Sequence, residues 1–230
     1  MLRVLNGFMV LVALVTLSCG GGGEDEDIDD SSGGDDSKDA SSRATPTAED
    51  LVAIANTAVP GFEAVDPRAT GLGATVVYSS ETKTAGGAQV QVLVSLASCD
   101  PFICGKLDPE AYSSPEAQRN LKSILPTAHI ENPDLRWEFG IVDLSGETGL
   151  YTYALSYVET KDNSGGTTRI SANTYRAWYH DGRIFISMDV YARGATSVRS
   201  LADLEAGMSK AEAEKAAKDV FAALKPAFKD

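Results

Sequence analysis

The chain has 230 residues, of which 43% are hydrophobic, and its formal net charge at pH 7 is −13. This hydrophobic content is typical of a globular protein, and the roughly 180 residues left after a leader and a polar segment can bury a single core. The acidic charge argues against nucleic acid as a partner and against electrostatic attachment to anionic lipid, because both need a basic surface.

Residues 1–18 are predicted to be an export signal. Arg3 precedes an apolar run from about Gly7 to Leu17. This run is too short to cross a bilayer, which takes roughly 20 apolar residues. A cationic residue, a short apolar run and then the small Ser18 are typical of a secretory leader.

The sequence Leu17-Ser18-Cys19-Gly20 follows this run and resembles the lipobox of bacterial lipoproteins. The resemblance implies cleavage before Cys19 and acylation of this cysteine, for example with palmitate. One position departs from the family pattern, because Thr16 stands where Leu is usual. We therefore expect an exported lipoprotein anchored in the bacterial cell envelope, at the periplasmic or surface-exposed face of the outer membrane. An ordinary signal peptide with an incidental cysteine is the alternative.

Residues 19–44 are predicted to be the lipidated cysteine followed by a disordered, acidic, Gly- and Ser-rich tether. Ile28 stands among nine acidic residues between positions 20 and 40, and so little apolar surface cannot offset the entropy of ordering. The tether would reach at most ~90 Å when fully extended and about 30 Å as a flexible coil. Acidic residues close behind a lipidated cysteine also resemble the sorting or surface-export signals of some bacteria.

Residues 45–230 are predicted to form a single α+β domain, an antiparallel sheet of about six or seven strands packed with helices. The first helix begins either at Thr45-Pro46 or with Thr47 and Asp50 as a capping box, and Pro60-Gly61 ends it. Alternating apolar residues predict strands near 62–65, 74–80 and 88–97. A second helix is expected at 113–126.

Cys99 and Cys104 are separated by four residues. In an oxidising compartment such a pair is predicted to form a disulfide. A redox dithiol is the alternative, but the spacing is not C-x-x-C and no neighbouring base is evident. A metal site is also conceivable, although the sequence offers no second pair of ligands beside these cysteines.

The segment from Leu135 to Val190 is predicted to be a four-strand meander. Turns are expected at Gly146 and Gly149, at 162–166 and at Asp181-Gly182. The last pair is typical of a type I′ hairpin, which has positive φ at both central residues. A two-residue turn there predicts three cross-strand pairs: Tyr179 with Ile184, Ala177 with Ile186, and Tyr175 with Met188.

This hairpin is expected to have one buried face and one mixed face. The buried face, under the C-terminal helix, comprises Tyr175, Ala177, Tyr179, Ile184, Ile186, Met188 and Val190. The mixed face includes Arg176, Trp178, Phe185 and Asp189, our candidate binding face, with Arg176 and Asp189 as a diagonal surface ion pair. The aromatic residues Trp178, Phe185 and Tyr191 could line a cleft. Alternatively, a helix covers them, because a sheet that is apolar on both sides implies layers on both sides.

The C-terminal helix is signalled by a capping box, Ser209 with Glu212, and is ended by Pro226. No catalytic or phosphate-binding motif is evident, so no catalytic residue, cofactor or metal ligand is assigned. The two histidines, His129 and His180, are interpreted as exposed loop and hairpin residues.

The order of elements resembles the Mog1/PsbP-type fold, which occurs in several bacterial lipoproteins. The resemblance covers about residues 45–228, rests on element order alone and carries no functional residues. It implies a non-enzymatic binding or accessory module with an envelope protein as partner. The alternative is an envelope enzyme that uses the aromatic face as a substrate cleft.

Overall fold

The computed structural model describes residues 45–71, 73–100, 104, 109, 135–161, 167–194 and 198–228. The predicted leader and tether, the helix expected at 113–126 and the turn at 162–166 lie outside the described residues, as does His129. Within the described ranges the chain forms an antiparallel sheet with helices packed against it, which confirms the α+β class.

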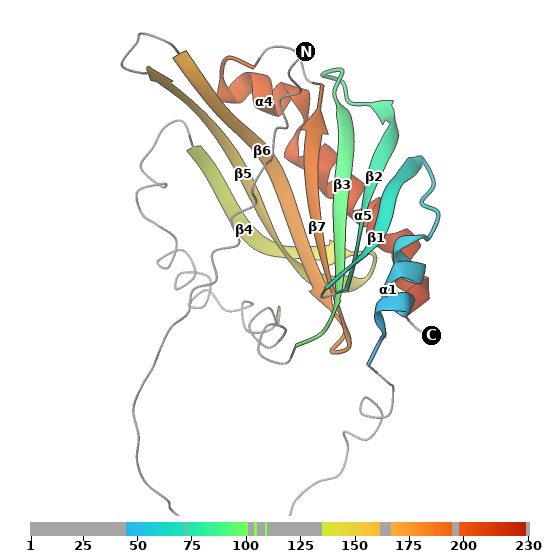
Figure 1. The fold of residues 1–230 in the computed structure, drawn as a ribbon. Coiled ribbons are helices and arrows are strands. Elements are labelled where there is room, and N and C mark those ends of the chain that lie inside the picture. Colours follow the sequence, from blue (N-terminus) through green and yellow to red (C-terminus); the bar gives the residue numbers. More distant parts are fainter. Residues whose placement is uncertain are drawn as a thin grey trace, which may run out of the picture. The chain divides into compact units, whose positions relative to one another are not determined.

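Seven antiparallel strands form one sheet in the order β1-β2-β3-β7-β6-β5-β4 (Figure 1). The last four strands are consecutive neighbours, which confirms the four-strand meander. Strand β7 also pairs with β3 and so joins the meander to the first three strands. The strands are β1 (Phe62–Thr70), β2 (Gly73–Lys83), β3 (Gln89–Ser98), β4 (Leu135–Leu144), β5 (Glu147–Lys161), β6 (Thr167–His180) and β7 (Ile184–Arg193).

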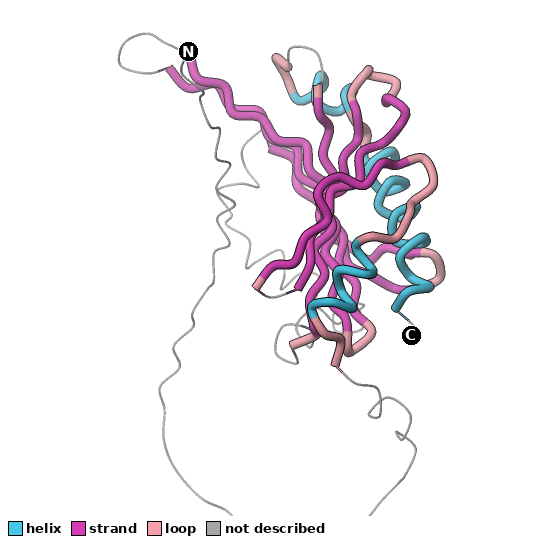
Figure 2. The backbone as a smooth tube through the Cα atoms, turned by 45° about the vertical axis from the view of Figure 1, so that its right-hand side comes forward, coloured by secondary structure: helices cyan, strands magenta, loops and turns pink. Residues whose placement is uncertain are grey.

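All the helices within the described residues pack on one side of this sheet (Figure 2). They are α1 (Ala48–Ala55), α4 (Leu201–Gly207), α5 (Lys210–Leu224) and the 3₁₀ turn η3 (Lys225–Phe228). We call this side of the sheet the helix face and the opposite side the outer face. Figure 1 looks at the outer face, with α5 behind the strands.

Helix α1 begins with the predicted capping box of Thr47 and Asp50. The main-chain N–H of Thr47 donates to the Asp50 carboxylate over 2.8 Å, and this bond is the main cause that lowers the pKa of Asp50. At the other end, the buried Tyr78 hydroxyl lies 3.0 Å from the carbonyl oxygens of both Ala55 and Thr57. Burial raises the pKa of Tyr78 to about 12, so this donor stays protonated and holds the end of α1 on the sheet.

The predicted buried face of the β6–β7 hairpin is the centre of the core. All its members are buried except Tyr179, which is half-buried and packs against α5 and η3. The Tyr179 ring meets Phe221 edge-on, with 5.0 Å between ring centroids, and stacks on Phe228 at 6.5 Å. The expectation that the C-terminal helix covers this face is confirmed.

The turn of that hairpin differs from our prediction. His180 pairs with Phe185 and Tyr179 with Ile186, so the register is shifted by two residues from the one expected. Gly182 has a φ of 86°, but Asp181 does not have positive φ, which excludes a type I′ turn. Instead, the Asp181 carboxylate accepts from the main-chain N–H groups of Arg183 and Ile184, each over 2.8 Å. A shift of two residues keeps every side chain on its predicted face.

The two-residue hairpin with positive φ at both central positions lies between β4 and β5. It consists of Ser145 (φ 55°) and Gly146 (φ 86°), and Leu144 pairs directly with Glu147. The prediction that Gly149 belongs to the turn is wrong, because Gly149 lies inside β5. A side chain there would meet the Trp178 carbonyl oxygen, since a Cβ would lie only 2.7 Å from it.

Helix α4 was not predicted from the sequence. Ser200 caps it by accepting from the main-chain N–H of Asp203. Its end is fixed to the sheet by the buried Asn173 of β6, whose side-chain amide donates to the carbonyl oxygens of Leu204 and Met208, each over 2.7 Å. This contact sets where the chain turns into α5.

Helix α5 has the predicted capping box of Ser209 and Glu212. Glu214 and Lys218 form the expected ion pair on its exposed side, at 2.7 Å. No helix in the described part of the chain combines the length and hydropathy needed to span a bilayer.

Candidate functional site

The candidate binding face lies on the outer face of the sheet. Strand register places Arg176 opposite Asp189 and Trp178 opposite Ser187, and Phe185 lies on the same side one step further along β7. All these side chains are half-buried, between the closed core and open solvent. The sequence therefore predicted correctly that these residues share a face distinct from the core, because alternation along a strand fixes the side of each residue.

Arg176 and Asp189 form an ion pair on this face. They are direct cross-strand partners, so the predicted diagonal arrangement is wrong, a consequence of the two-residue register shift. The Arg176 guanidinium also lies 5.9 Å from the centre of the Trp178 ring. With its side chain 41% exposed, against 20% for that of Asp189, the pair contributes about 1 kcal/mol or less to stability. The ion pair therefore contributes little to stability but places one positive and one negative group side by side near the middle of the sheet.

The three aromatic side chains predicted to line a cleft are spread along the strands of the outer face. Phe185 and Tyr191 are six residues apart on β7, which corresponds to about 20 Å along a strand, and Trp178 lies between them on the neighbouring strand. These three form a row rather than a cluster around one point. A stacked pair, Trp137 and Phe139 with 6.2 Å between ring centroids, lies on the same face at β4. This arrangement suits contact with an extended surface better than enclosure of a small substrate.

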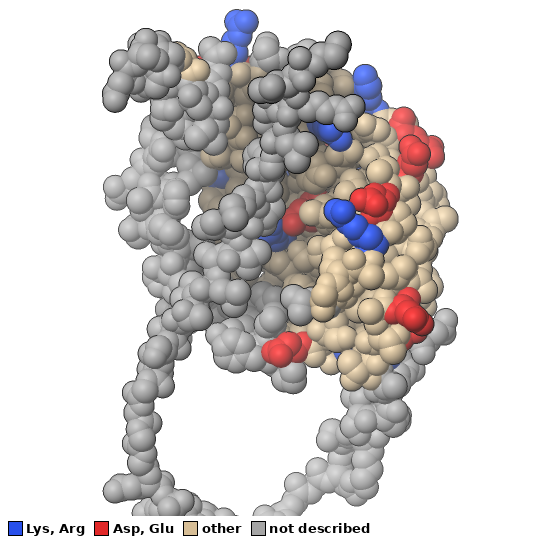
Figure 3. Space-filling model, viewed as in Figure 1, with Lys and Arg blue, Asp and Glu red and all other residues tan. Residues whose placement is uncertain are grey.

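The edges of the outer face carry exposed apolar side chains. Within the described residues two large hydrophobic side chains are classed as exposed, Val65 on β1 at 43% and Ile141 on β4 at 39%. Both lie on the outer face, because Val65 pairs with Val77 and Ile141 pairs with Leu150, across from Trp178. Where described residues are visible from this side, uncharged surface predominates over scattered charged groups (Figure 3).

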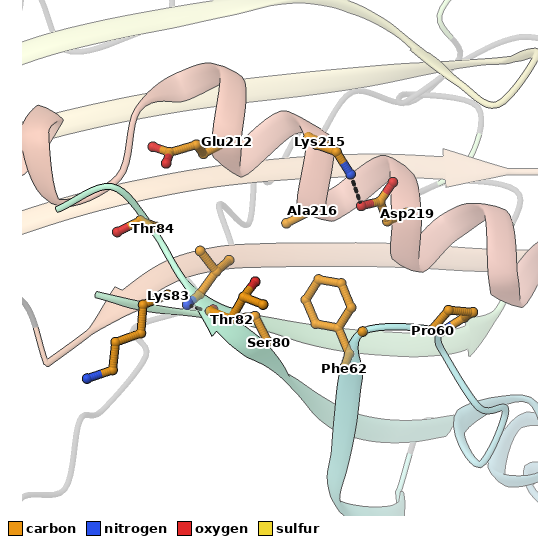
Figure 4. A pocket seen from close by; sticks show the side chains of 12 residues that line it. Pro60, Phe62, Ser80, Thr82, Lys83, Thr84, Glu212, Lys215, Ala216 and Asp219 are labelled. Carbon is orange, nitrogen blue, oxygen red and sulfur yellow. Dashed lines mark hydrogen bonds and ion pairs between the residues drawn. The ribbon is translucent and has the colours of Figure 1, made fainter. Parts of the chain in front are cut away.

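A hollow of about 370 Å³ lies on the other side of the sheet, where α5 passes over β1 and β2. Of the four charged groups that line the hollow, three are hydrogen-bonded within α5 or its cap. Lys215 bonds to Asp219 on the same helix over 2.5 Å, and Glu212 holds the helix cap. Lys83 extends away from the other labelled side chains (Figure 4). The hollow therefore lacks converging titratable groups among the residues that line it.

Two tyrosine hydroxyls on the helix face are buried without a hydrogen-bond partner, those of Tyr153 and Tyr175. Burial raises the pKa of Tyr153 to about 12 and that of Tyr175 higher still. Both phenols therefore stay neutral at physiological pH. They fill the core under the helices, where Tyr175 stacks on Tyr151 with 5.4 Å between centroids.

Cys99 and Cys104 form the predicted disulfide, with 6.0 Å between their Cα atoms. The structure adds His180, whose ring lies beside the two sulfur atoms. Our interpretation of His180 as an exposed hairpin residue is wrong, because both its ring nitrogens are buried and have no hydrogen-bond partner. No local sequence signal could have linked His180 to the cysteines, since the link depends on the pairing of β3 with β7.

Comparison with known protein families and with characterised proteins gives no match for this chain. Three features of the described residues are candidates for a functional role: the outer face, the hollow beside α5 and the group formed by Cys99, Cys104 and His180.

Proposed function

We propose that this protein is an exported lipoprotein, held in the cell envelope by lipid on Cys19, whose folded part binds a partner protein through the outer face of its sheet. The lipobox-like sequence at Leu17-Ser18-Cys19-Gly20 supports the anchor. The acidic tether supports display at a distance from the membrane, because a flexible coil of its length separates its ends by about 30 Å.

One observation carries the binding role: Val65 and Ile141, the two exposed large apolar side chains of the described residues, lie on this same face, at its opposite edges. The aromatic row lies between them. Single exposed apolar residues are common, so the support comes from their sharing one face with the aromatic side chains between them, because extended apolar surface marks an interaction site. Trp, Tyr and Arg, all present here, are the residues that most often dominate binding energy at protein interfaces.

The partner surface is defined by this chemistry. The outer face offers apolar edges around one central ion pair of Arg176 and Asp189. A protein surface that presents apolar side chains around its own acid–base pair would match both features. Nucleic acid would not, since it needs a run of positive charge.

The alternative of an envelope enzyme has less support. An aromatic substrate cleft needs side chains that converge on one point, whereas Trp178, Phe185 and Tyr191 are spread along the strands. The charged groups beside Trp178 and on the facing strand, Arg176 and Asp189, pair with each other. Neither is placed as a lone acid or base beside a cavity.

A photo-crosslinking side chain placed at two matched positions in the full chain tests the binding role in the native envelope. Ser187 lies at the centre of the outer face, and Ala222 is an exposed small residue on α5. We expect discrete higher-mass adducts from position 187 and none of comparable yield from position 222. Adding Trp178→Ala should reduce the yield from position 187 severalfold, because it removes the largest apolar contact.

Equal adducts from both positions would contradict the proposal, since they would report crowding rather than a binding face. So would the absence of any adduct from position 187. A lysate lacking the membrane fraction is not a substitute, because the proposed partner belongs to the envelope.

The anchor is tested separately with Cys19→Ala. This variant should move from the membrane fraction to the soluble fraction, because the acyl chains on Cys19 are the membrane attachment that the sequence offers. Intact-mass measurement of the membrane-extracted wild type should show the lipid. A wild-type mass without lipid would rule out this part of the proposal and leave the binding face untouched.

A further inference from the structure

Two neighbouring cysteines and a histidine that is far from them in the sequence meet at one end of the sheet. Cys99 follows β3 directly, and its main-chain N–H donates to the Arg183 carbonyl over 2.7 Å, which extends the β3–β7 pairing past Ser98. On the other side of β7, His180 pairs with Phe185. The ligand atoms of Cys99, Cys104 and His180 all lie within 4.8 Å of one another.

The His180 ring is the unexplained member of this group. Both ring nitrogens are buried and neither has a hydrogen-bond partner. A neutral imidazole carries one donor and one acceptor, and leaving such groups unpaired inside a protein is costly because they lose their hydrogen bonds to water. Unsatisfied buried groups of this kind often mark a functional site or a missing ion. The ring beside two sulfur atoms therefore points to a ligand.

We propose that Cys99, Cys104 and His180 form a redox-controlled site for a borderline divalent metal ion such as Zn²⁺. As a disulfide the pair binds no metal. Once reduced, it supplies two thiolates, and His180 supplies the third ligand through a ring nitrogen.

The ligand set and its spacing fit this ion. Two cysteines separated by four residues fall within the spacing of known zinc sites, and two sulfurs with one imidazole are a known catalytic zinc set that leaves the fourth position open. Bond lengths of about 2.3 Å to sulfur and 2.0 Å to nitrogen would place the ligand atoms about 3.5–3.7 Å apart. The ring nitrogen and the sulfur atoms lie at most 4.8 Å apart, so these separations need to close by roughly 1 Å, while the two bonded sulfur atoms need to move apart.

Each cysteine also makes a main-chain hydrogen bond that does not depend on the disulfide. The N–H of Cys99 is bonded to β7, and the N–H of Cys104 donates to the Asp100 carbonyl over 2.8 Å. Reduction breaks the S–S bond and removes neither the donor nor the acceptor of these two hydrogen bonds. The sulfurs can then separate to metal-binding distance while staying beside His180.

The reaction balances with a dithiol as reductant. The dithiol gives two electrons and two protons to the Cys99–Cys104 bond and becomes a disulfide itself. Zn²⁺ then displaces the two thiol protons and is bound by two thiolates and His180. A disulfide oxidant reverses the sequence and releases the ion. Because the metal stabilises the reduced form, each tenfold excess of metal over its dissociation constant should raise the midpoint potential by about 30 mV.

The test uses the full chain carrying Cys19→Ser, so that no third thiol competes. A phosphine reductant opens the disulfide by taking oxygen from water, and Co²⁺ is added without air as a spectroscopic stand-in for Zn²⁺. We expect one Co²⁺ per chain, with a thiolate-to-metal band in the near ultraviolet and visible bands of a tetrahedral ion, all removed by Zn²⁺. The oxidised protein should show none of these bands.

His180→Ala should weaken Co²⁺ binding at least tenfold, and the matched variant His129→Ala should not. Retention of the Cys99–Cys104 disulfide in oxidised His180→Ala, with wild-type thermal unfolding, would show that this variant is folded. Binding that is unchanged in His180→Ala would overturn the proposal, since two cysteines alone would then be the chelator. Reduced protein without thiolate bands would overturn it as well.

Discussion

The two faces of the sheet have the same strands and opposite characters. On the helix face the side chains are large, apolar and fully buried, as Tyr78, Tyr175, Ile186 and Met188 show. On the outer face the residues between them in sequence are half-buried and mixed, as Arg176 and Ser187 illustrate. One-residue alternation is all that separates the two sets.

This difference indicates which face carries most of the stability, and it is the basis of the proposed binding role. The helix face is fixed by burial and by specific anchors such as Asn173, whose amide bonds to two carbonyl groups of the helical layer. The outer face also holds a buried bond from Gln91 to Ser79 and the buried Leu150, but it keeps Val65 and Ile141 in reach of solvent. The fold therefore depends mainly on the helix face, and we propose the outer face as the contact surface.

The largest expected effect comes from the helical layer. Phe221 is fully buried against Tyr179 and Phe228, and Phe221→Ala should lower the free energy of unfolding by about 3–5 kcal/mol. Lys215→Ala, on the exposed side of the same helix, should change it by less than about 0.5 kcal/mol. Urea denaturation of both variants measures the contrast. Similar losses would mean that α5 is not held on the sheet by the side of the helix that carries Phe221.

A smaller effect is expected at the end of the sheet where Cys99 and Cys104 lie. Replacing both with alanine should lower the free energy of unfolding by about 2 kcal/mol, the loop-closure entropy of so short a loop. Reduced wild-type protein without metal should lose a similar amount. Thiol labelling of both cysteines in freshly isolated, unreduced protein would refute the disulfide on which this prediction rests.

The smallest expected effect is at the capping box that begins α5. The pKa of Glu212 is lowered, mainly by the hydrogen bond that its carboxylate accepts from the Ser209 main-chain N–H. The ionised carboxylate therefore stabilises the folded state at pH values above the unfolded-state pKa. This stabilisation is lost as pH falls through the folded-state pKa, which lies below 4.5. Glu212→Gln should cost about 0.5–1 kcal/mol at pH 7. Denaturation at low pH should show wild type and variant converging. A difference that stays constant with pH would exclude a charge effect.

The turns show how far the sequence could predict this fold. Asp181-Gly182 has the composition of a type I′ turn, but the Asp181 side chain bonds to two main-chain N–H groups and opens the loop. Ser145-Gly146, less typical in composition, adopts positive φ at both positions. The faces were nevertheless predicted correctly, because a two-residue shift preserves alternation.

Non-local features could not be predicted. Nothing near β3 in sequence indicates that it pairs with β7, yet that pairing brings Cys99 beside His180. Helix α4 is only seven residues long, too short for a clear helical period. Its position depends on Asn173, a single residue 31 positions away from Leu204.

The most direct test of the two-face account compares neighbouring residues of β7. Ile186 is completely buried on the helix face, and Ser187 lies on the outer face opposite Trp178. Chemical denaturation should show that Ile186→Ala loses about 2–5 kcal/mol of unfolding free energy and that Ser187→Ala loses less than about 0.5 kcal/mol. Equal losses, or a larger loss at Ser187, would contradict the assignment of the two faces.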